Sequence, residues 1–307
     1  MAIIEEFHSN GLDKFRMVIF DQATELIGTI YDNKESNKGV LLFPGFTEHR
    51  SSLDELAKQL SEHFKVIAFD INSQGESTGK FDLSSIADNI YHTHKNIKRF
   101  YKLEKIGAFG NSIGGMGIAL AATRPRSRFD ALCLTSTPAN LQAFFPKVLG
   151  YILKKTPQSL VRAGTILFDM LESVKNPEYR NKTHKQFHNG KFYQPYAQLG
   201  ALKIKNLKEI IEAIETAPNL GYYAKKIKTP TLFIYGGNDK MLGIKNSKMP
   251  KNIQKMMIRV KGKKHLIMAD RADHSLNIRT KMDDCFNQDK KYSSIKKSIV
   301  TYFKHYL

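Results

Sequence analysis

Short apolar runs alternate with amphipathic stretches along most of the 307-residue chain. Runs rich in β-branched and aromatic residues predict strands over residues 15–20, 24–31, 39–43, 65–69, 105–109, 130–135, 231–235 and 264–269. Apolar positions spaced three, four and seven residues apart predict helices over residues 51–61, 82–101, 115–123, 246–260 and 292–307. We expect Ser51 or Ser52 to cap the first of these helices. The alternation predicts an α/β fold in which a mostly parallel central sheet is flanked by helices.

The strand pattern is interrupted between residues 139 and 224. This segment holds three helical patterns, over residues 144–153, 160–174 and 204–214, and the strand pattern resumes after it. We interpret the segment as a helical cap, or lid, inserted after the sixth predicted strand of a single core. The chain then divides into a first part of the core over 1–138, the cap over 139–224 and a second part of the core over 225–307.

One motif lies at the junction of a predicted strand and a predicted helix. The residues Gly110-Asn111-Ser112-Ile113-Gly114 follow an apolar run and precede a stretch of small residues. Such a G-x-S-x-G turn holds a serine hydroxyl out of the backbone, and its glycines avoid Cβ clashes and allow unusual dihedral angles. The alternative is a glycine-rich turn that binds phosphate at the helix N-terminus. Ser112 is therefore a candidate nucleophile, provided that a base and an acid accompany it.

Candidates for the base and the acid follow the last two predicted strands. Asp239 lies in a Gly-Gly-Asn-Asp turn after the strand at 231–235, and His274 lies after the strand at 264–269. Because parallel strands all end at one edge of a sheet, both residues should lie near Ser112. The order Ser, Asp, His along the chain is the one expected for this kind of turn, so we predict a catalytic triad of Ser112, His274 and Asp239. The weaker candidates are Asp70 and Asp273 for the acid, and His49, His265, His184 and His188 for the base.

Attack of a serine on a carbonyl group creates an oxyanion that needs two fixed N–H donors. Ile113, the residue after the nucleophile, should supply one backbone N–H. Phe46 should supply the other, because Pro44-Gly45-Phe46 follows the strand at 39–43 and Gly45 lets the backbone approach a substrate closely. This chemistry requires no metal ion and no organic cofactor.

Five stretches occur in a fixed order along the chain, at residues 39–46 (GVLLFPGF), 69–77 (FDINSQGES), 110–115 (GNSIGG), 230–239 (PTLFIYGGND) and 272–275 (ADHS). Together they resemble the α/β-hydrolase superfamily, and within it the monoacylglycerol-lipase and serine-aminopeptidase-like branch. The resemblance covers residues 38–138 and 228–307. Two places depart from the family pattern. Pro44 stands where the family usually has histidine, and Asn72 and Ser73 replace the arginine and glycine of its Asp-x-Arg-Gly-x-Gly-x-Ser loop.

The resemblance implies an α/β-hydrolase fold and a serine hydrolase. The predicted cap is more apolar than one buried stripe requires. Its apolar residues can serve the packing of the cap and its contact with the core, or part of them can line an acyl-binding wall or dock on a lipid surface. On the second interpretation we hypothesise a small-molecule ester substrate with an apolar acyl chain. We therefore expect an esterase, similar to a monoacylglycerol lipase, that cleaves carboxylic esters through an acyl-enzyme. The alternatives are an acyltransferase or thioesterase on the same triad and an aminopeptidase-like peptidase, which the positive charge of the cap disfavours. A binding protein without catalysis is a further alternative, but all three triad positions are filled.

The composition adds a strong positive charge, because 48 Lys and Arg residues face 29 Asp and Glu residues, for a net charge of +19. The lysines lie singly or in pairs, without the Arg-rich or aromatic-interleaved pattern of a nucleic-acid module, so we expect no nucleic-acid partner. We interpret most of them as solvated surface, with contact to an anionic membrane surface as the alternative.

The N-terminal residues MAIIEEFHSN lack the basic and apolar regions of a secretory signal. No run of about 18 apolar residues predicts a transmembrane helix. Cys133 and Cys285 lie far apart in the sequence and do not resemble a disulfide framework. We therefore expect a cytoplasmic protein.

Overall fold

The structure is a computed structural model. It describes residues 2–9, 12–19, 24–33, 35–46, 48–142, 212–239, 241–274, 276 and 288–307.

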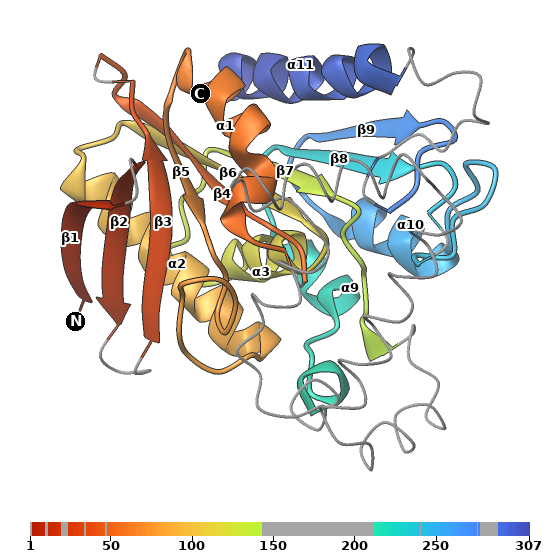
Figure 1. The fold of residues 1–307 in the computed structure, drawn as a ribbon. Coiled ribbons are helices and arrows are strands. Elements are labelled where there is room, and N and C mark those ends of the chain that lie inside the picture. The colour runs from red at the N-terminus through yellow and green to blue at the C-terminus, as the bar shows by residue number, and fades with distance from the viewer. Residues whose placement is uncertain are drawn as a thin grey trace, which may run out of the picture.

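The described strands form one nine-stranded sheet in the order β1-β2-β3-β5-β4-β6-β7-β8-β9 (Figure 1). Their bounds are β1 (Ala2–Ser9), β2 (Leu12–Ile19), β3 (Thr24–Tyr31), β4 (Lys38–Phe43), β5 (Lys65–Phe69), β6 (Lys105–Asn111), β7 (Ala131–Thr135), β8 (Thr231–Gly236) and β9 (Lys264–Ala269). The first three strands pair antiparallel, and β3 also pairs antiparallel with β5. All pairings from β5 to β9 are parallel. The mostly parallel sheet expected from the sequence is confirmed.

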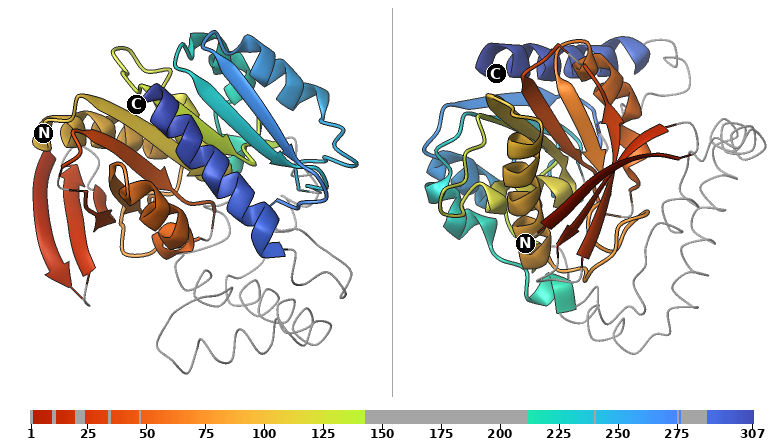
Figure 2. Two further views of the ribbon diagram at one scale, coloured as in Figure 1. Left: turned by 90° about the horizontal axis from the view of Figure 1, so that it is seen from above. Right: turned by 90° about the vertical axis from the view of Figure 1, so that its left-hand side faces the viewer.

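Helices cover both faces of this sheet (Figures 1 and 2). Their bounds are η2 (Arg50–Leu53), α1 (Asp54–Ser61), α2 (Leu83–Phe100), α3 (Ser112–Ala121), α9 (Leu220–Tyr223), η4 (Ala224–Lys226), α10 (Lys251–Arg259) and α11 (Gln288–Tyr306). Buried residues of α1 and α11 form one hydrophobic cluster against the sheet. Buried residues of α2, α3, α9 and α10 form the other cluster. The sheet therefore lies between two apolar layers, as in an α/β fold.

Two elements differ from the sequence prediction, one in its existence and one in where it begins. Strand β1 was not predicted; it pairs only with β2 at the edge of the sheet, so its apolar residues do not follow a buried-strand pattern. Helix α10 begins at Lys251 and not at Asn246, because Pro250 precedes it and proline disfavours helical conformation in the residue before it.

The start of α1 also differs from the prediction. Its first turn is the 3₁₀ helix η2, whose N-cap is His49 and not Ser51 or Ser52. The His49 Nδ1 atom accepts a hydrogen bond from the Ser51 backbone N–H at 3.2 Å. The side chain of His49 therefore does the capping that the sequence suggested for a serine.

The predicted cap over 139–224 lies mostly outside the described residues. Residues 212–215 are helical, and α9 and η4 follow them. The predicted helices at 144–153 and 160–174 lie outside the described residues, as does most of the one at 204–214. The segment follows the seventh strand and not the sixth, because β1 adds a strand that the sequence pattern did not predict.

Among the helices that the structure describes, none combines the length and apolar character needed to cross a membrane.

Candidate active site

Ser112 lies at the sharp turn between β6 and α3. It is the first residue of α3 and has a φ of 49°, a left-handed conformation that side chains other than glycine seldom adopt. This conformation turns the chain abruptly from strand to helix and is the kind of local strain found at functional sites. Ser112 is therefore held at the tip of the turn, at the carboxyl end of β6.

Glycines on either side of Ser112 are needed for close packing. A Cβ at Gly110 would lie 2.6 Å from the backbone carbon of Gly114, and one at Gly114 would lie 2.4 Å from the Pro44 carbonyl oxygen. Neither glycine has a positive φ, so the expectation that they supply unusual dihedral angles is wrong. The unusual angle is at Ser112 itself, and the glycines allow the turn and the loop after β4 to approach α3.

Asp239 and His274 reach the same edge from the loops after β8 and β9. A Cβ at Gly236 would lie 2.1 Å from the Asp273 carbonyl oxygen, so glycine at the end of β8 lets the loop that carries His274 cross closely over it. This close approach gives a physical reason for the Gly-Gly-Asn-Asp turn. Both side chains are thereby positioned next to the turn that holds Ser112.

The three side chains form a continuous hydrogen-bonded chain. The His274 Nε2 atom lies 3.0 Å from the Ser112 Oγ, and its Nδ1 lies 2.8 Å from the Asp239 Oδ2. Asp239 is fully buried, and its Oδ1 accepts a hydrogen bond from the Leu242 N–H at 3.0 Å. Ser136 Oγ donates a hydrogen bond to the His274 carbonyl oxygen at 2.6 Å, which fixes the backbone of the residue that carries the imidazole. The structure thus brings together the three residues that the sequence singled out.

The weaker candidates are engaged elsewhere or lie outside the described residues. His265 is exposed on β9, and its Nε2 contacts the Tyr306 hydroxyl at 2.7 Å. His49 caps η2, and burial lowers the pKa of its imidazole. The carboxylate within hydrogen-bond distance of His274 Nδ1 is that of Asp239. His184 and His188 lie outside the described residues. Within the described ranges, no group of three or more His, Cys, Asp or Glu side chains is arranged to hold a metal ion.

The two residues predicted to form the oxyanion hole lie on neighbouring segments. Ile113 is the second residue of α3, so its N–H belongs to the first turn, where the helix itself offers no acceptor. Phe46 lies in the loop after β4, and its ring packs on Phe81 with centroids 5.0 Å apart. The close approach of Gly114 to the Pro44 carbonyl brings this loop against the first turn of α3.

Two side chains that the sequence reasoning missed hold the peptide at Gly45. Glu48 Oε2 accepts a hydrogen bond from the Gly45 N–H at 2.6 Å, and Gln74 Nε2 donates to the Gly45 carbonyl oxygen at 3.2 Å. Asn111, the residue before Ser112, donates from Nδ2 to both Glu48 carboxylate oxygens at 3.2 and 3.3 Å. The loop after β4 is therefore tied through Glu48 to the turn that holds Ser112. The only sequence signal was position, since Glu48 closely follows the stretch at 39–46 and Gln74 lies within the stretch at 69–77.

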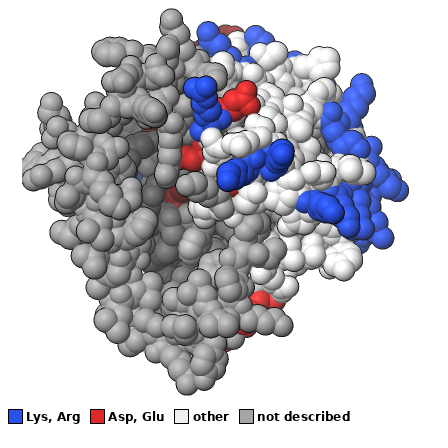
Figure 3. Space-filling model, turned by 90° about the vertical axis from the view of Figure 1, so that its right-hand side faces the viewer, with Lys and Arg blue, Asp and Glu red and all other residues white. Residues whose placement is uncertain are grey.

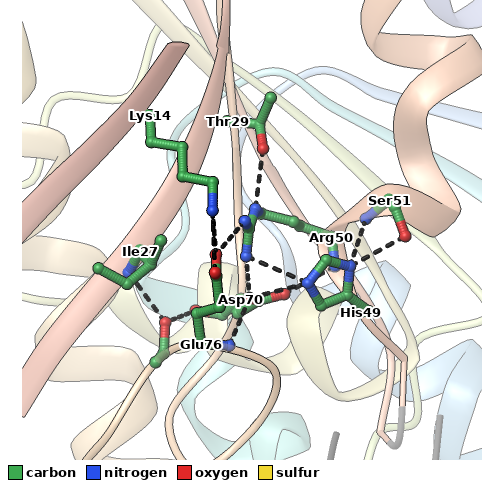
Figure 4. Close-up of polar contacts among 9 residues, drawn as sticks. Lys14, Ile27, Thr29, His49, Arg50, Ser51, Asp70 and Glu76 are labelled. Carbon is green, nitrogen blue, oxygen red and sulfur yellow. Dashed lines mark hydrogen bonds and ion pairs between the residues drawn. The ribbon is translucent and has the colours of Figure 1, made fainter. Parts of the chain in front are cut away.

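A network of charges lies behind this loop (Figure 4). The guanidinium of buried Arg50 contacts the carboxylates of Asp70 and Glu76, and its Nε donates to the Thr29 hydroxyl at 2.8 Å. Lys14 Nζ donates to Glu76 at 2.9 Å. Burial pushes the pKa of Glu76 upward, but the contacts with Lys14 and Arg50 outweigh it and lower that pKa. Asp70 is thus paired with Arg50, which excludes it as the partner of His274 in this structure.

The loop from Asp70 to Ser77 keeps a turned conformation despite its departures from the family pattern. Ser73, which replaces the family's glycine, has a φ of 64°. Asn72, which replaces the family's arginine, accepts from Asn89 Nδ2 at 3.0 Å and donates to the Lys80 carbonyl oxygen at 3.3 Å. The arginine that pairs with Asp70 comes from η2 and not from this loop.

Comparison with known proteins identifies the family of the chain. A family model described as serine aminopeptidase, S33, matches residues 34–278, which is most of the chain. The chain belongs to this family of α/β hydrolases. Membership in the S33 family confirms the resemblance and the fold expected from the sequence. No curated protein matches the chain significantly in sequence.

Several solved structures share the fold of this family member. A hydrolase from Pseudomonas aeruginosa is 15% identical, with a TM-score of 0.65, and the match covers 96% of this chain and 99% of that one. An enol-lactonase from Burkholderia xenovorans is 17% identical, with a TM-score of 0.62, and the match covers 92% and 97%. An esterase from Pyrococcus furiosus is 16% identical, with a TM-score of 0.61, and the match covers 99% and 91%. At these identities the likeness establishes the α/β-hydrolase fold.

Proposed function

We propose that this chain is a serine hydrolase that cleaves carboxylic esters through an acyl-enzyme. The observation that carries the proposal is the chain of contacts from Ser112 Oγ through the His274 imidazole to Asp239, at 3.0 and 2.8 Å. These distances suit a nucleophile, its general base and the acid that orients the base. Membership in an α/β-hydrolase family supports the same class of reaction.

In the proposed mechanism, Ser112 Oγ attacks the ester carbonyl carbon while His274 Nε2 takes its proton. Asp239 stays ionised and stabilises the imidazolium from the other side of the ring. The N–H groups of Phe46 and Ile113 stabilise the oxyanion, and collapse of the tetrahedral intermediate expels the alcohol, which receives its proton from His274. Water, activated by His274, then attacks the acyl-enzyme and releases the acid.

The proposed substrate is an ester with an apolar acyl chain. This part rests on the sequence of residues 139–224, where apolar side chains exceed what one buried helix face requires. An acyl-binding wall there would favour medium-length over short acyl chains, because each buried methylene contributes about 0.8 kcal/mol.

The test is covalent labelling with a fluorophosphonate probe, which reacts with an activated serine. The wild-type protein should label and Ser112→Ala should not, whereas the control Ser298→Ala, on α11, should label as the wild type does. A wild-type protein that fails to label would overturn the assignment.

The proposed substrate is tested by the rates of hydrolysis of p-nitrophenyl esters with acyl chains of increasing length. Equal rates for short and medium acyl chains would contradict a preference for an apolar acyl chain. Faster acyl transfer to an added alcohol or thiol than to water would indicate a transferase instead.

A further inference from the structure

One end of the core carries an uninterrupted positive charge. Between Gly221 and Ala269 the sequence has 12 Lys and Arg residues and a single acidic one, Asp239. Asp239 is fully buried and contacts His274, so it contributes no negative charge to the surface. Every exposed charge that the structure describes in this stretch is therefore positive.

Six of these basic side chains lie on α10, on the turn after it and at the start of β9, and we call this surface the basic face. They are the exposed residues Lys251, Lys255, Arg259, Lys261, Lys263 and Lys264. Within the described part of the chain, none of the six forms an ion pair, in contrast to the paired charges around Asp70. Figure 3 views the end of the molecule that carries β9 and α10, and it shows Lys and Arg gathered at its right with no Asp or Glu among them.

Large apolar side chains protrude among these charges. Ile258 is 72% exposed and Tyr222 is 67% exposed. Lys251, Lys255 and Ile258 lie four and three residues apart, so they share one stripe of α10. Arg259 Nη1 donates to the Gly221 carbonyl oxygen at 2.8 Å, which holds Tyr222 beside the end of this helix.

Strand β9 extends the same surface. Lys264 Nζ donates to the Val260 carbonyl oxygen at 2.9 Å, so the start of β9 is tied to the end of α10. Leu266, two residues along β9, lies on the same face of the strand as Lys264 and is 47% exposed. Exposed apolar and basic side chains therefore lie together on the neighbouring elements α9, α10 and β9.

We propose that the basic face docks onto an anionic lipid bilayer. Basic side chains near an acidic bilayer attract its headgroups, while exposed aromatic and aliphatic side chains enter the boundary between headgroups and acyl chains. A purely electrostatic partner, such as a nucleic acid, would account for the lysines but not for the exposure of Ile258 and Leu266. The proposal rests on the described core alone and does not depend on the reaction at Ser112.

The test is binding of the full-length protein to sedimented vesicles, which is measured without reference to catalysis. The protein should bind vesicles of phosphatidylcholine with about 30% phosphatidylglycerol and should not bind vesicles of phosphatidylcholine alone. Binding should weaken steeply as salt is raised. The triple variant Lys251→Glu, Lys255→Glu, Lys261→Glu should bind the anionic vesicles at least about 100-fold more weakly than the wild type.

A matched triple variant controls for the loss of net charge. Lys95→Glu, Arg99→Glu and Lys102→Glu remove the same number of exposed positive charges from α2 and the residues after it. This variant should bind the vesicles nearly as well as the wild type. Equal losses in the two triple variants would overturn the proposal, because the attraction would then follow net charge and not this face. Thermal midpoints near the wild-type value would establish that both variants are folded.

The apolar side chains separate a bilayer from other polyanions. Ile258→Ser should weaken vesicle binding several-fold and leave its salt dependence unchanged, because it removes apolar insertion but no charge. The proposal would be overturned in favour of a nucleic acid if Ile258→Ser left vesicle binding unchanged and the protein also bound a duplex oligonucleotide tightly. In that case the triple variant Lys251→Glu, Lys255→Glu, Lys261→Glu would lose the oligonucleotide. No binding of the wild-type protein to anionic vesicles at low salt would also overturn it.

Discussion

Replacing Glu48 with alanine should slow the proposed reaction without weakening substrate binding. Its carboxylate accepts the Gly45 N–H at 2.6 Å and the Asn111 amide at 3.2 and 3.3 Å, and so ties the loop that carries Phe46 to the turn that carries Ser112. The Glu48→Ala variant removes these contacts and leaves the Gly45 N–H without its acceptor. The Phe46 N–H should then be less well fixed where the oxyanion forms.

The expected loss is a fraction of the full value of an oxyanion donor. Removing one such donor costs about 2.7–4 kcal/mol of transition-state stabilisation. Glu48→Ala leaves the Phe46 N–H present, and Gln74 still donates to the Gly45 carbonyl oxygen at 3.2 Å. Hydrogen bonds to a charged group contribute about 1.5–3 kcal/mol. We therefore expect a loss of about 1.4–2.7 kcal/mol, which is a fall of about 10- to 100-fold in kcat.

The assay is steady-state hydrolysis of a p-nitrophenyl ester by wild type, Glu48→Ala and Glu48→Gln. Glutamine keeps an oxygen that can accept the Gly45 N–H, so this variant should recover most of kcat. Glu62→Ala, a change at an exposed glutamate after α1, should leave both constants unchanged. The reasoning is refuted if Glu48→Ala changes KM and not kcat, or if Glu48→Gln is as slow as Glu48→Ala.

Two further predictions concern stability. Burial beside Phe129 lowers the pKa of His94 from 6.5 to about 4, so unfolding takes up a proton in this window and the free energy of unfolding should fall as the pH drops from about 6.5 to 4. The loss of unfolding free energy should reach about 3 kcal/mol. Urea unfolding at pH 7 and at pH 4.5 should show a smaller loss for His94→Leu than for the wild type. Equal losses in the two proteins would contradict the prediction. Ser73→Gly should raise the unfolding free energy by about 1 kcal/mol, because Ser73 has a φ of 64° and glycine adopts this conformation without steric cost. A lower thermal midpoint for Ser73→Gly would show that the serine side chain contributes more than its backbone strain costs.

The sequence was sufficient to predict the parallel part of the sheet and to place Ser112, Asp239 and His274 at one edge of it. Buried parallel strands are continuous apolar runs, and the rule that they end at one edge brings the residues after them together. The positions of Ser112, Asp239 and His274 follow from strand order alone. Their distances do not, because these depend on the crossing of β8 by the loop that carries His274, which Gly236 permits.

The side chains that support the site could not be predicted in the same way. Glu48 and Gln74 are polar residues in loops, and the same residue types are common in loops exposed to solvent. The contacts of Glu48 and Gln74 depend on which loop each side chain faces. This is set by the pairing of β4 with β5 and with β6, strands that are distant from one another in the sequence. Edge strand β1 was missed for a related reason, since it is defined by its pairing with β2 and not by burial.

The loop from Asp70 to Ser77, where the chain departs from the family pattern, is supported by contacts from within the loop and from η2. Asn72 replaces the family's arginine, but Asp70 is not left as an unpaired buried charge, because Arg50 reaches it from η2. Removing one partner of a buried ion pair costs about 3–5 kcal/mol, so Arg50 and Asp70 should be replaceable only together. The left-handed turn at Ser73 persists without glycine because the loop is fixed elsewhere: Asp70 accepts the N–H groups of Arg50 at 2.7 Å and of Glu76 at 2.9 Å. A motif comparison of this loop alone therefore underestimates how well its buried carboxylate is paired, since the guanidinium that contacts Asp70 comes from η2, outside the loop.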